Sequence, residues 1–258
     1  MLLAIDIGNS TIKFGIFDGE ELVHKFSIHT ARDYGEDELK FDRLRVLDED
    51  FIRINTVIVA SVVPELNDTL RAVCWDEFKV RPIFVDHTFD FGLTIEYTPL
   101  ESLGIDRLVN CAAAAQRYGS PLIVCSFGTA TTIDLVREGG EFAGGVIAPG
   151  MVTMADMLNK RTSQLPLVDI RKPEKLIGNS TEEAIRSGVF FGYLGLVEGL
   201  VDRFRSLFET PVPVVGTGGL GPTVLRETSL IDHHDENLTL FGLKLVGEAT
   251  LSRSLGNI

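Results

Sequence analysis

Two short segments place glycine beside hydroxyl and amide side chains at the end of an apolar strand. The first runs from Asp6 to Lys13 in DIGNSTIK, and the second runs from Ser126 to Thr132 in SFGTATT. Glycine lets the backbone approach a ligand closely, and hydroxyl, amide and main-chain N–H groups donate hydrogen bonds without bulk. These segments therefore suit a phosphate group, although threonine is also a common strand residue and glycine a common turn residue.

The two segments belong to an internal repeat. LLAIDIGNSTIKFGI aligns without gaps with LIVCSFGTATTIDLV, so that Gly8 matches Gly128 and Thr11 matches Thr131. In both copies an apolar strand reaches the glycine, passes a polar segment and resumes as an apolar strand, which predicts two β-hairpins with polar turns. Two such turns could hold one polyphosphate between them.

The copies differ at a position that matters for cation binding, because Asp6 matches Ser126. An acid beside a phosphate is useful when it holds a cation. Asp6 is therefore a candidate ligand of Mg²⁺ through water, and Lys13 places a positive charge near the phosphates. The second copy lacks this acid.

A second kind of chemistry is indicated by GIDR. Gly104 precedes an apolar, alanine-rich stretch that predicts a helix from about Ile105 to Tyr118. Asp106 and Arg107 then lie in its first turn. Because the helix dipole stabilises an acid there, a purely structural role for Asp106 is the alternative to a catalytic one.

A longer helix is predicted from about Ser180 to Phe208, where Ser180 and Glu183 have capping-box spacing. Each glycine in a helix costs about 1 kcal/mol relative to alanine, so glycines in a stripe need a close-packed partner. The partner is either the protein's own sheet or a second copy of the chain. The stripe consists of Gly188, Gly192, Gly195 and Gly199.

The order of elements predicts the fold class. Apolar segments at about 55–63, 81–87 and 212–215 predict further strands. The last is followed by GTGGLG, which suits either a nucleoside lying on bare backbone or a plain strand-to-helix turn. Strands and helices alternate similarly in both halves, so we expect an α/β protein of two similar domains, residues 1–118 and 119–258.

Composition narrows the function classes. The chain has 24 Lys and Arg against 37 Asp and Glu, a net charge of −13, and no basic block, which argues against a nucleic-acid partner. Its 3 cysteines lack the spacing of a disulfide framework or a zinc site. We recognise neither a secretion signal nor an apolar run long enough to cross a bilayer, so a soluble cytoplasmic protein without a membrane partner is expected.

Several motifs together resemble the type III pantothenate kinase family. In chain order they are DIGNSTIKFG, GIDR, FGTATTID, GGVIAPG, LPLV, STEEAIRSG and GTGG. The resemblance implies two ribonuclease-H-like domains of the acetate and sugar kinase, Hsp70 and actin superfamily, with the active site in the cleft between them. It also implies a homodimer that phosphorylates pantothenate with ATP and Mg²⁺, the first step of coenzyme A biosynthesis.

The resemblance further implies roles for individual residues. Asp106 would be the catalytic base that accepts the proton of the pantothenate hydroxyl. ATP would be bound by Asp6, Ile7, Gly8, Asn9, Ser10, Thr11, Ile12, Lys13 and Thr129. Pantothenate would be bound by Tyr97, Gly104, Ile105, Asp106, Arg107 and Thr181, of which Thr181 would come from the partner subunit.

One position departs from the family pattern. The family normally has an aspartate, associated with K⁺ or NH₄⁺, where this chain has Ser126. Two alternatives to the pantothenate kinase therefore stay open. One is a catalytically weak or inactive regulatory homologue that resembles the Bvg accessory factor group, and the other is a kinase for a different small hydroxylated acid.

Overall fold

The computed structural model describes residues 1–39 and 54–256, and its contacts divide the chain into two units. Unit 1 contains Met1–Leu93, Tyr97–Ala113 and Asn237–Ile258, whereas unit 2 contains Thr94–Glu96 and Ala114–Glu236. The C-terminal helix thus belongs to unit 1. The domain limits expected from the sequence, 1–118 and 119–258, divide the chain differently and stay a prediction.

Unit 1 is built on a five-stranded mixed sheet. Strand β1 runs antiparallel to β2 and parallel to β4, and its apolar side chains are buried because helices cover both faces of the sheet. The strands in spatial order are β3 (Glu21–His29), β2 (Thr11–Asp18), β1 (Leu2–Ile7), β4 (Thr56–Ser61) and β5 (Ile83–Phe84).

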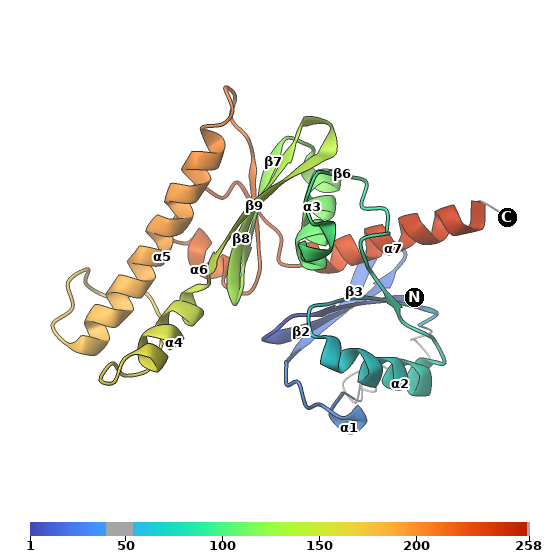
Figure 1. The fold of residues 1–258 in the computed structure, drawn as a ribbon, viewed down its shortest axis with the longest axis horizontal. Coiled ribbons are helices and arrows are strands. Elements are labelled where there is room, and N and C mark those ends of the chain that lie inside the picture. The colour runs from blue at the N-terminus through green and yellow to red at the C-terminus, as the bar shows by residue number, and fades with distance from the viewer. Residues whose placement is uncertain (40–53, 257–258) are drawn as a thin grey trace. The chain divides into compact units, whose positions relative to one another are not determined.

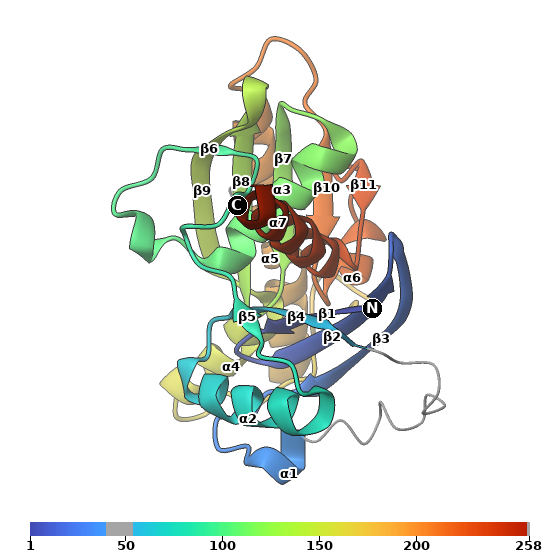
Figure 2. The same ribbon diagram turned by 90° about the vertical axis from the view of Figure 1, so that its right-hand side faces the viewer.

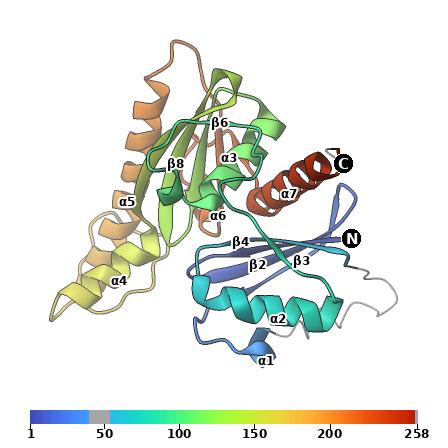
Figure 3. The same ribbon diagram turned by 45° about the vertical axis from the view of Figure 1, so that its right-hand side comes forward.

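The helices of unit 1 surround this sheet. Figure 3 shows α2 (Asn67–Phe78) and α7 (Leu238–Gly256) on opposite faces. The predicted helix at 105–118 is confirmed as α3 (Ile105–Tyr118), whose first half belongs to unit 1. The short helical segments are α1 (Glu36–Leu39), η1 (Pro64–Leu66) and η2 (Leu100–Ser102).

Unit 2 is built on a six-stranded mixed sheet, whose strands are labelled side by side in Figure 2. The predicted hairpin is present, because β7 and β8 pair antiparallel. The strands in spatial order are β11 (His233–His234), β10 (Val214–Thr217), β7 (Leu122–Phe127), β8 (Ala130–Arg137), β9 (Glu141–Pro149) and β6 (Thr94–Ile95).

The longest helix of unit 2, α5 (Thr181–Arg205), lies along one face of this sheet, with α4 (Met151–Arg161) beside it (Figure 1). Its predicted start is confirmed, because the Ser180 hydroxyl accepts a hydrogen bond from the Glu183 N–H at 3.2 Å. The Glu183 carboxylate accepts from the N–H of Asn179 at 2.7 Å. Unit 2 also contains η3 (Glu138–Gly140) and α6 (Gly221–Leu225).

The two sheets show the expected duplication. In unit 1 the order β3-β2-β1-β4-β5 has an antiparallel hairpin followed by two parallel strands. In unit 2 the order β9-β8-β7-β10-β11 has the same antiparallel and parallel pairings, and β6 is added beside β9. The expected α/β fold of two similar ribonuclease-H-like halves is therefore confirmed.

The ungapped alignment of the two repeat copies was wrong, because their turns differ in length by one residue. Register pairs Ile7 with Ile12 in unit 1, but Phe127 with Thr131 in unit 2. The first tip, Gly8–Thr11, is therefore one residue longer than the second tip, Gly128–Ala130. Thr131 corresponds to Ile12 and not to Thr11, and the position of Lys13 is taken by Thr132.

The glycine stripe of α5 does not pack on the protein's own sheet. A Cβ added at Gly188, Gly192 or Gly195 would meet no atom within 4 Å among the described residues. A Cβ at Gly199 would meet only the side chain of Arg203 on the same helix. The interpretation that the stripe packs on the protein's own sheet is therefore not supported, and contact with a second copy stays a prediction.

The expectation that no apolar run could cross a bilayer was wrong for α5. Within the described residues this helix is long and apolar enough by length and composition, with a mean hydropathy of 1.3 over an 18-residue window. Of that window 44% is buried inside the protein. A core helix passes the same test, and side chains of α5 such as Phe190 and Tyr193 are fully buried.

The structure explains why the turn after β10 contains glycine at position 218. Gly218 has φ +94°, and a Cβ there would lie 2.5 Å from the carbonyl oxygen of Phe127. Only glycine allows β10 to leave the sheet so close to the second tip. This supports the interpretation of GTGGLG as a strand-to-helix turn that packs against the tip.

Candidate active site

The first tip carries a charged pair across the hairpin. Asp6 on β1 lies directly opposite Lys13 on β2, and Lys13 Nζ is 3.8 Å from Asp6 Oδ2. The side chains are 14% and 29% exposed, so the carboxylate is the more buried partner. Strand pairing therefore fixes one acid and one ammonium beside the turn that was predicted to contact phosphate.

The Asp6 carboxylate lies in an unfavourable place for a negative charge. Its pKa is raised from the ordinary 3.8 to about 6, mainly because it is buried; Lys13 opposes this shift, and repulsion from Asp106 adds to it. A bound cation would relieve both the desolvation and the repulsion. Asp6 thus has the properties of a ligand for Mg²⁺, which prefers a few carboxylates together with phosphate oxygens and water.

The carboxylate of Asp106, at the start of α3, occupies the space that a side chain at Gly104 would fill. A Cβ at Gly104 would lie 2.5 Å from Asp106 Oδ1, so the carboxylate folds back over the glycine. Burial raises the pKa of Asp106, and this rise is opposed by the Arg107 N–H, the Arg107 charge and the charge of Lys13. A carboxylate with a raised pKa is a better proton acceptor than an ordinary one.

Arg107 and Tyr97 lie beside this carboxylate in unit 1. Arg107 is only 5% exposed, and its guanidinium carbon lies 5.8 Å from the centre of the Tyr97 ring. The positive group is thereby fixed against an aromatic face. Such a pair could hold an anionic or hydroxylated substrate near Asp106.

Two residues that support the site were not recognised from the sequence. The hydroxyl of Thr30 donates to the carbonyl of Gly8 at 2.7 Å, and the Thr30 N–H donates to the carbonyl of Ser10 at 3.0 Å. His87 Nε2 lies 2.8 Å from the carbonyl oxygen of Leu103, just before α3. No motif marks either residue, because both act across distant parts of the chain.

The second tip is held by the segment that follows β9. The carbonyl of Thr129 accepts hydrogen bonds from the Gly150 N–H at 2.9 Å and from the Thr153 hydroxyl at 2.6 Å. A Cβ at Gly150 would collide with the carbonyl oxygen of Gly128. The motif GGVIAPG therefore supports the tip, and Thr129 itself is exposed to solvent.

The charged pair of the first tip is replaced by neutral groups in the second. Ser126 lies opposite Thr132 on β8 and beside Thr217 on β10. The Thr217 hydroxyl is buried and has no hydrogen-bond partner among the described residues. These groups are neutral oxygens, which attract a monovalent cation less strongly than a carboxylate does.

The predicted site residues fall into both units. Unit 1 brings together Asp6, Lys13, Tyr97, Gly104, Ile105, Asp106 and Arg107, whereas Ser126, Thr129 and Thr181 lie in unit 2. The side chains of Ile7 and Ile12 are buried in the core of unit 1, so only their main-chain groups could reach a nucleotide. Gly8, Asn9, Ser10 and Thr11 form the first tip. Thr181 is exposed at the start of α5.

The sequence matches the family model for type III pantothenate kinase over residues 2–203. The chain belongs to this family. A type III pantothenate kinase of Brevibacillus brevis is 40% identical over 255 residues, which cover 98% of this chain and 100% of the relative. One from a Geobacillus species, strain WCH70, is 38% identical over 256 residues, covering 98% and 99%.

Solved structures support the fold of this type III pantothenate kinase family member. A Campylobacter jejuni protein, described as a proposed Baf family transcriptional activator, has a TM-score of 0.59 at 19% identity and covers 99% of this chain and 100% of its own. A Clostridium difficile activator of 2-hydroxyisocaproyl-CoA dehydratase, with bound ADPNP, has a TM-score of 0.55 at 14% identity, covering 98% and 97%. At these identities the likeness shows the fold alone.

Proposed function

We propose that this protein transfers the γ-phosphoryl group of ATP to the hydroxyl group of pantothenate, and thereby begins coenzyme A biosynthesis. Family membership over nearly the whole chain supports this reaction. The observation that carries it is the cluster in unit 1, where the buried carboxylates of Asp6 and Asp106 interact with Lys13. The carboxylate of Asp6 is suited to bind a cation, and that of Asp106 is suited to accept a proton.

Asp106 acts as the base. It accepts the proton of the pantothenate hydroxyl while that oxygen bonds to the γ-phosphorus, and the bond from the γ-phosphorus to the β-phosphate oxygen breaks. The products are ADP and 4′-phosphopantothenate. Because phosphoryl transfer depends mostly on positioning and on charge stabilisation, a fixed carboxylate near the nucleophile is sufficient for the proton step.

The phosphates of ATP are contacted by Asp6 to Lys13 and by Thr129. Exposed main-chain N–H and hydroxyl groups of the tips supply hydrogen bonds, and Lys13 supplies positive charge. Asp6 would hold Mg²⁺ through water, and the ion would supply positive charge against the phosphates. Arg107 and Tyr97, together with Gly104 and Ile105, hold pantothenate beside Asp106.

We further propose a homodimer in which the partner subunit's Thr181 completes the pantothenate site. Support comes from the exposed glycines of α5, whose positions allow a second backbone to approach closely. Thr181 is the first residue of the same helix. A single interface along α5 would therefore bring the glycines against the partner and Thr181 to the partner's pantothenate site. Light scattering at assay concentrations tests this state, and a fully active monomer would contradict it.

The cytoplasm is the proposed location, because all three cysteines are buried and free. A K⁺ or NH₄⁺ requirement is also inherited from the family as a proposal, but Ser126 offers a neutral hydroxyl where the family has an acid. We therefore expect the dependence on monovalent cation to be weak, or to need a high concentration.

The test is ADP formation from ATP with and without pantothenate, across concentrations of K⁺ and NH₄⁺. Turnover that depends on pantothenate supports the kinase. ATP binding without such turnover would favour the regulatory homologue resembling the Bvg accessory factor group. Turnover with another hydroxylated acid, but not with pantothenate, would show that the proposed substrate is wrong. The assignments of the fold and of Asp106 as the base would still stand.

A further inference from the structure

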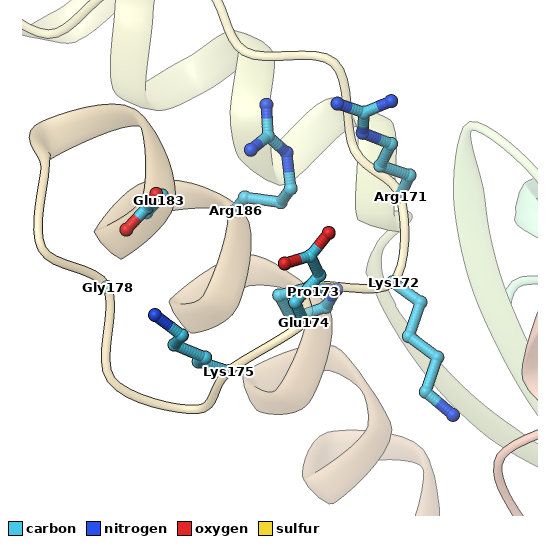
Figure 4. Close-up of a pocket in the computed structure, with 8 residues that line it drawn as sticks. All are labelled: Arg171, Lys172, Pro173, Glu174, Lys175, Gly178, Glu183 and Arg186. Atoms are coloured by element: carbon cyan, nitrogen blue, oxygen red, sulfur yellow. The ribbon is translucent and has the colours of Figure 1, made fainter.

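A cavity of about 420 Å³ lies in unit 2, where the segment before α5 folds over the first turns of that helix. Figure 4 shows the charged side chains around it. They are Arg171, Lys172, Lys175, Arg186, Glu174 and Glu183. The lining does not include any residue of the second tip, so the cavity is separate from the proposed ATP phosphate contacts.

Three of the four basic side chains keep open hydrogen-bond donors. Arg171 and Lys175 have no ion-pair or hydrogen-bond partner in the part of the chain that the structure describes. Arg186 uses its Nε to donate to the carbonyl of Asp169 at 3.1 Å, which leaves both terminal nitrogens of its guanidinium for a ligand. Figure 4 shows the guanidinium groups of Arg171 and Arg186 directed to the same side.

The remaining charged groups of the cavity are mostly engaged. Lys172 pairs with Glu227 at 2.8 Å, and Figure 4 shows its side chain extended away from the two arginines. The carboxylate of Glu183 accepts the Asn179 N–H at the start of α5. Neither Glu174 nor Glu183 has an ion pair in the described residues, so both acids bring negative charge to the cavity.

The three open cations outnumber these two acids, although the net charge of the chain is −13. Arg171, Lys175 and Arg186 line one cavity together with two acids, Glu174 and Glu183, which have no ion pair in the described residues. Guanidinium groups match the oxygens of phosphate in paired, charge-assisted hydrogen bonds, and an ammonium adds a compact charge. The cavity volume is in the range of small-ligand sites.

We propose that this cavity binds a small anion with two linked phosphoryl groups, of the kind present in inorganic pyrophosphate and in nucleoside diphosphates. Arg171 and Arg186 bind one phosphoryl group, and Lys175 binds the other. Glu174 opposes the ligand through its negative charge and thereby limits the affinity.

The experiment is calorimetric titration of the whole protein with pyrophosphate at fixed ionic strength. The double variant Arg171→Gln/Arg186→Gln should weaken binding by about ten-fold or more, since it removes the open guanidinium groups. Glu174→Gln should strengthen binding by roughly three-fold, because it removes one of the two unpaired acids. Arg161→Gln, which removes a cation of α4 outside the cavity, is the control and should change nothing.

Amide hydrogen exchange locates the binding. Pyrophosphate should protect the segment 171–178 and the start of α5 in the wild-type protein, and this protection should be lost in the double variant. Binding at the ATP tips would protect residues 6–13 or 126–132 in all four proteins alike. Neither measurement uses turnover, so the result is independent of the proposed kinase reaction. Equal affinity in wild type and double variant, or protection of the tips alone, would overturn the proposal.

Discussion

The hydroxyl oxygens of Thr131 and Tyr193 lie 2.6 Å apart in the core of unit 2, where both side chains are almost fully buried. Thr131 lies on β8 just after the second tip, and Tyr193 lies within α5. Burial raises the pKa of Tyr193 to about 12, so its hydroxyl remains protonated at neutral pH. One hydrogen bond therefore joins the strand that follows the second tip to the helix that begins at Thr181.

Tyr193→Phe leaves the buried Thr131 hydroxyl without its partner, which should cost about 1–3 kcal/mol of stability. We expect the melting temperature to fall by several degrees. The double variant with Thr131→Val removes both hydroxyls at nearly constant shape, so it should melt closer to wild type than Tyr193→Phe does. Calorimetry of the single and double variants checks this, and simply additive losses would show that the two groups act independently.

Asp106→Asn should abolish most pantothenate-dependent ADP formation while leaving ATP affinity nearly unchanged. The amide keeps the shape of the side chain but cannot accept the proton, and loss of a general base typically lowers the rate by about 10²–10⁴-fold. Steady-state kinetics and a nucleotide titration measure the two effects. Glu101→Gln, an exposed acid of η2, is the matched control and should retain activity. Near-normal turnover by Asp106→Asn would remove the base assignment.

Gly104→Ala tests whether turnover needs the present position of the Asp106 carboxylate, because the variant moves this group without removing it. The added Cβ would lie where Asp106 Oδ1 now lies, and a carboxylate at the end of a side chain can rotate away at low cost. We therefore expect a nearly unchanged melting temperature and a reduced kcat. If kcat is retained, the present position of the carboxylate over Gly104 is not needed for turnover.

The elements around this site could be predicted from local patterns. Helix α3 begins at Ile105, and the Ser180 and Glu183 cap begins α5, because both signals are encoded within a few neighbouring residues. The shorter second tip was missed, since apolar alternation continues on either side of a one-residue deletion. The supports given by Thr30 and His87 were also missed, because a long-range hydrogen bond leaves no periodic pattern in the sequence.

Asp6→Asn should stabilise the protein in the absence of metal and nucleotide. The folded state holds the Asp6 proton up to a pKa of about 6, whereas the unfolded state releases it near the ordinary 3.8, so stability falls as the pH rises through this window. A shift of this size corresponds to about 3 kcal/mol above pH 6. Asparagine does not carry this penalty.

Melting temperatures of Asp6→Asn and wild type, measured in EDTA from pH 4 to pH 8, check this prediction. The advantage of the variant should be largest above pH 6 and should become small toward pH 4, because it vanishes only below the unfolded-state pKa of 3.8, where Asp6 is protonated in both states. In the same variant, kinase activity should be low because the proposed Mg²⁺ ligand is lost. A constant difference across the pH range would show that the Asp6 charge is not its cause.

Ser126→Asp should restore a strong site for monovalent cation at the second tip. A carboxylate about 4 Å from a unit cation contributes roughly 4 kcal/mol at an effective dielectric constant of 20, part of which desolvation offsets. The aspartate would also lie beside Thr217, whose buried hydroxyl has no acceptor in the described part of the chain. We therefore expect tighter binding of K⁺ and faster phosphorylation at moderate K⁺.

The measurement is the rate of ADP formation against K⁺ concentration, with Na⁺ added to keep the ionic strength constant. Wild type should respond weakly or only at high K⁺, and Ser126→Asp should saturate at lower K⁺. Ser126→Asn has nearly the same shape as the aspartate variant without its charge, so it should behave like wild type if the charge is decisive. Should wild type already saturate at low K⁺, or should Ser126→Asp leave both the rate and the K⁺ dependence unchanged, another group must supply the cation ligand.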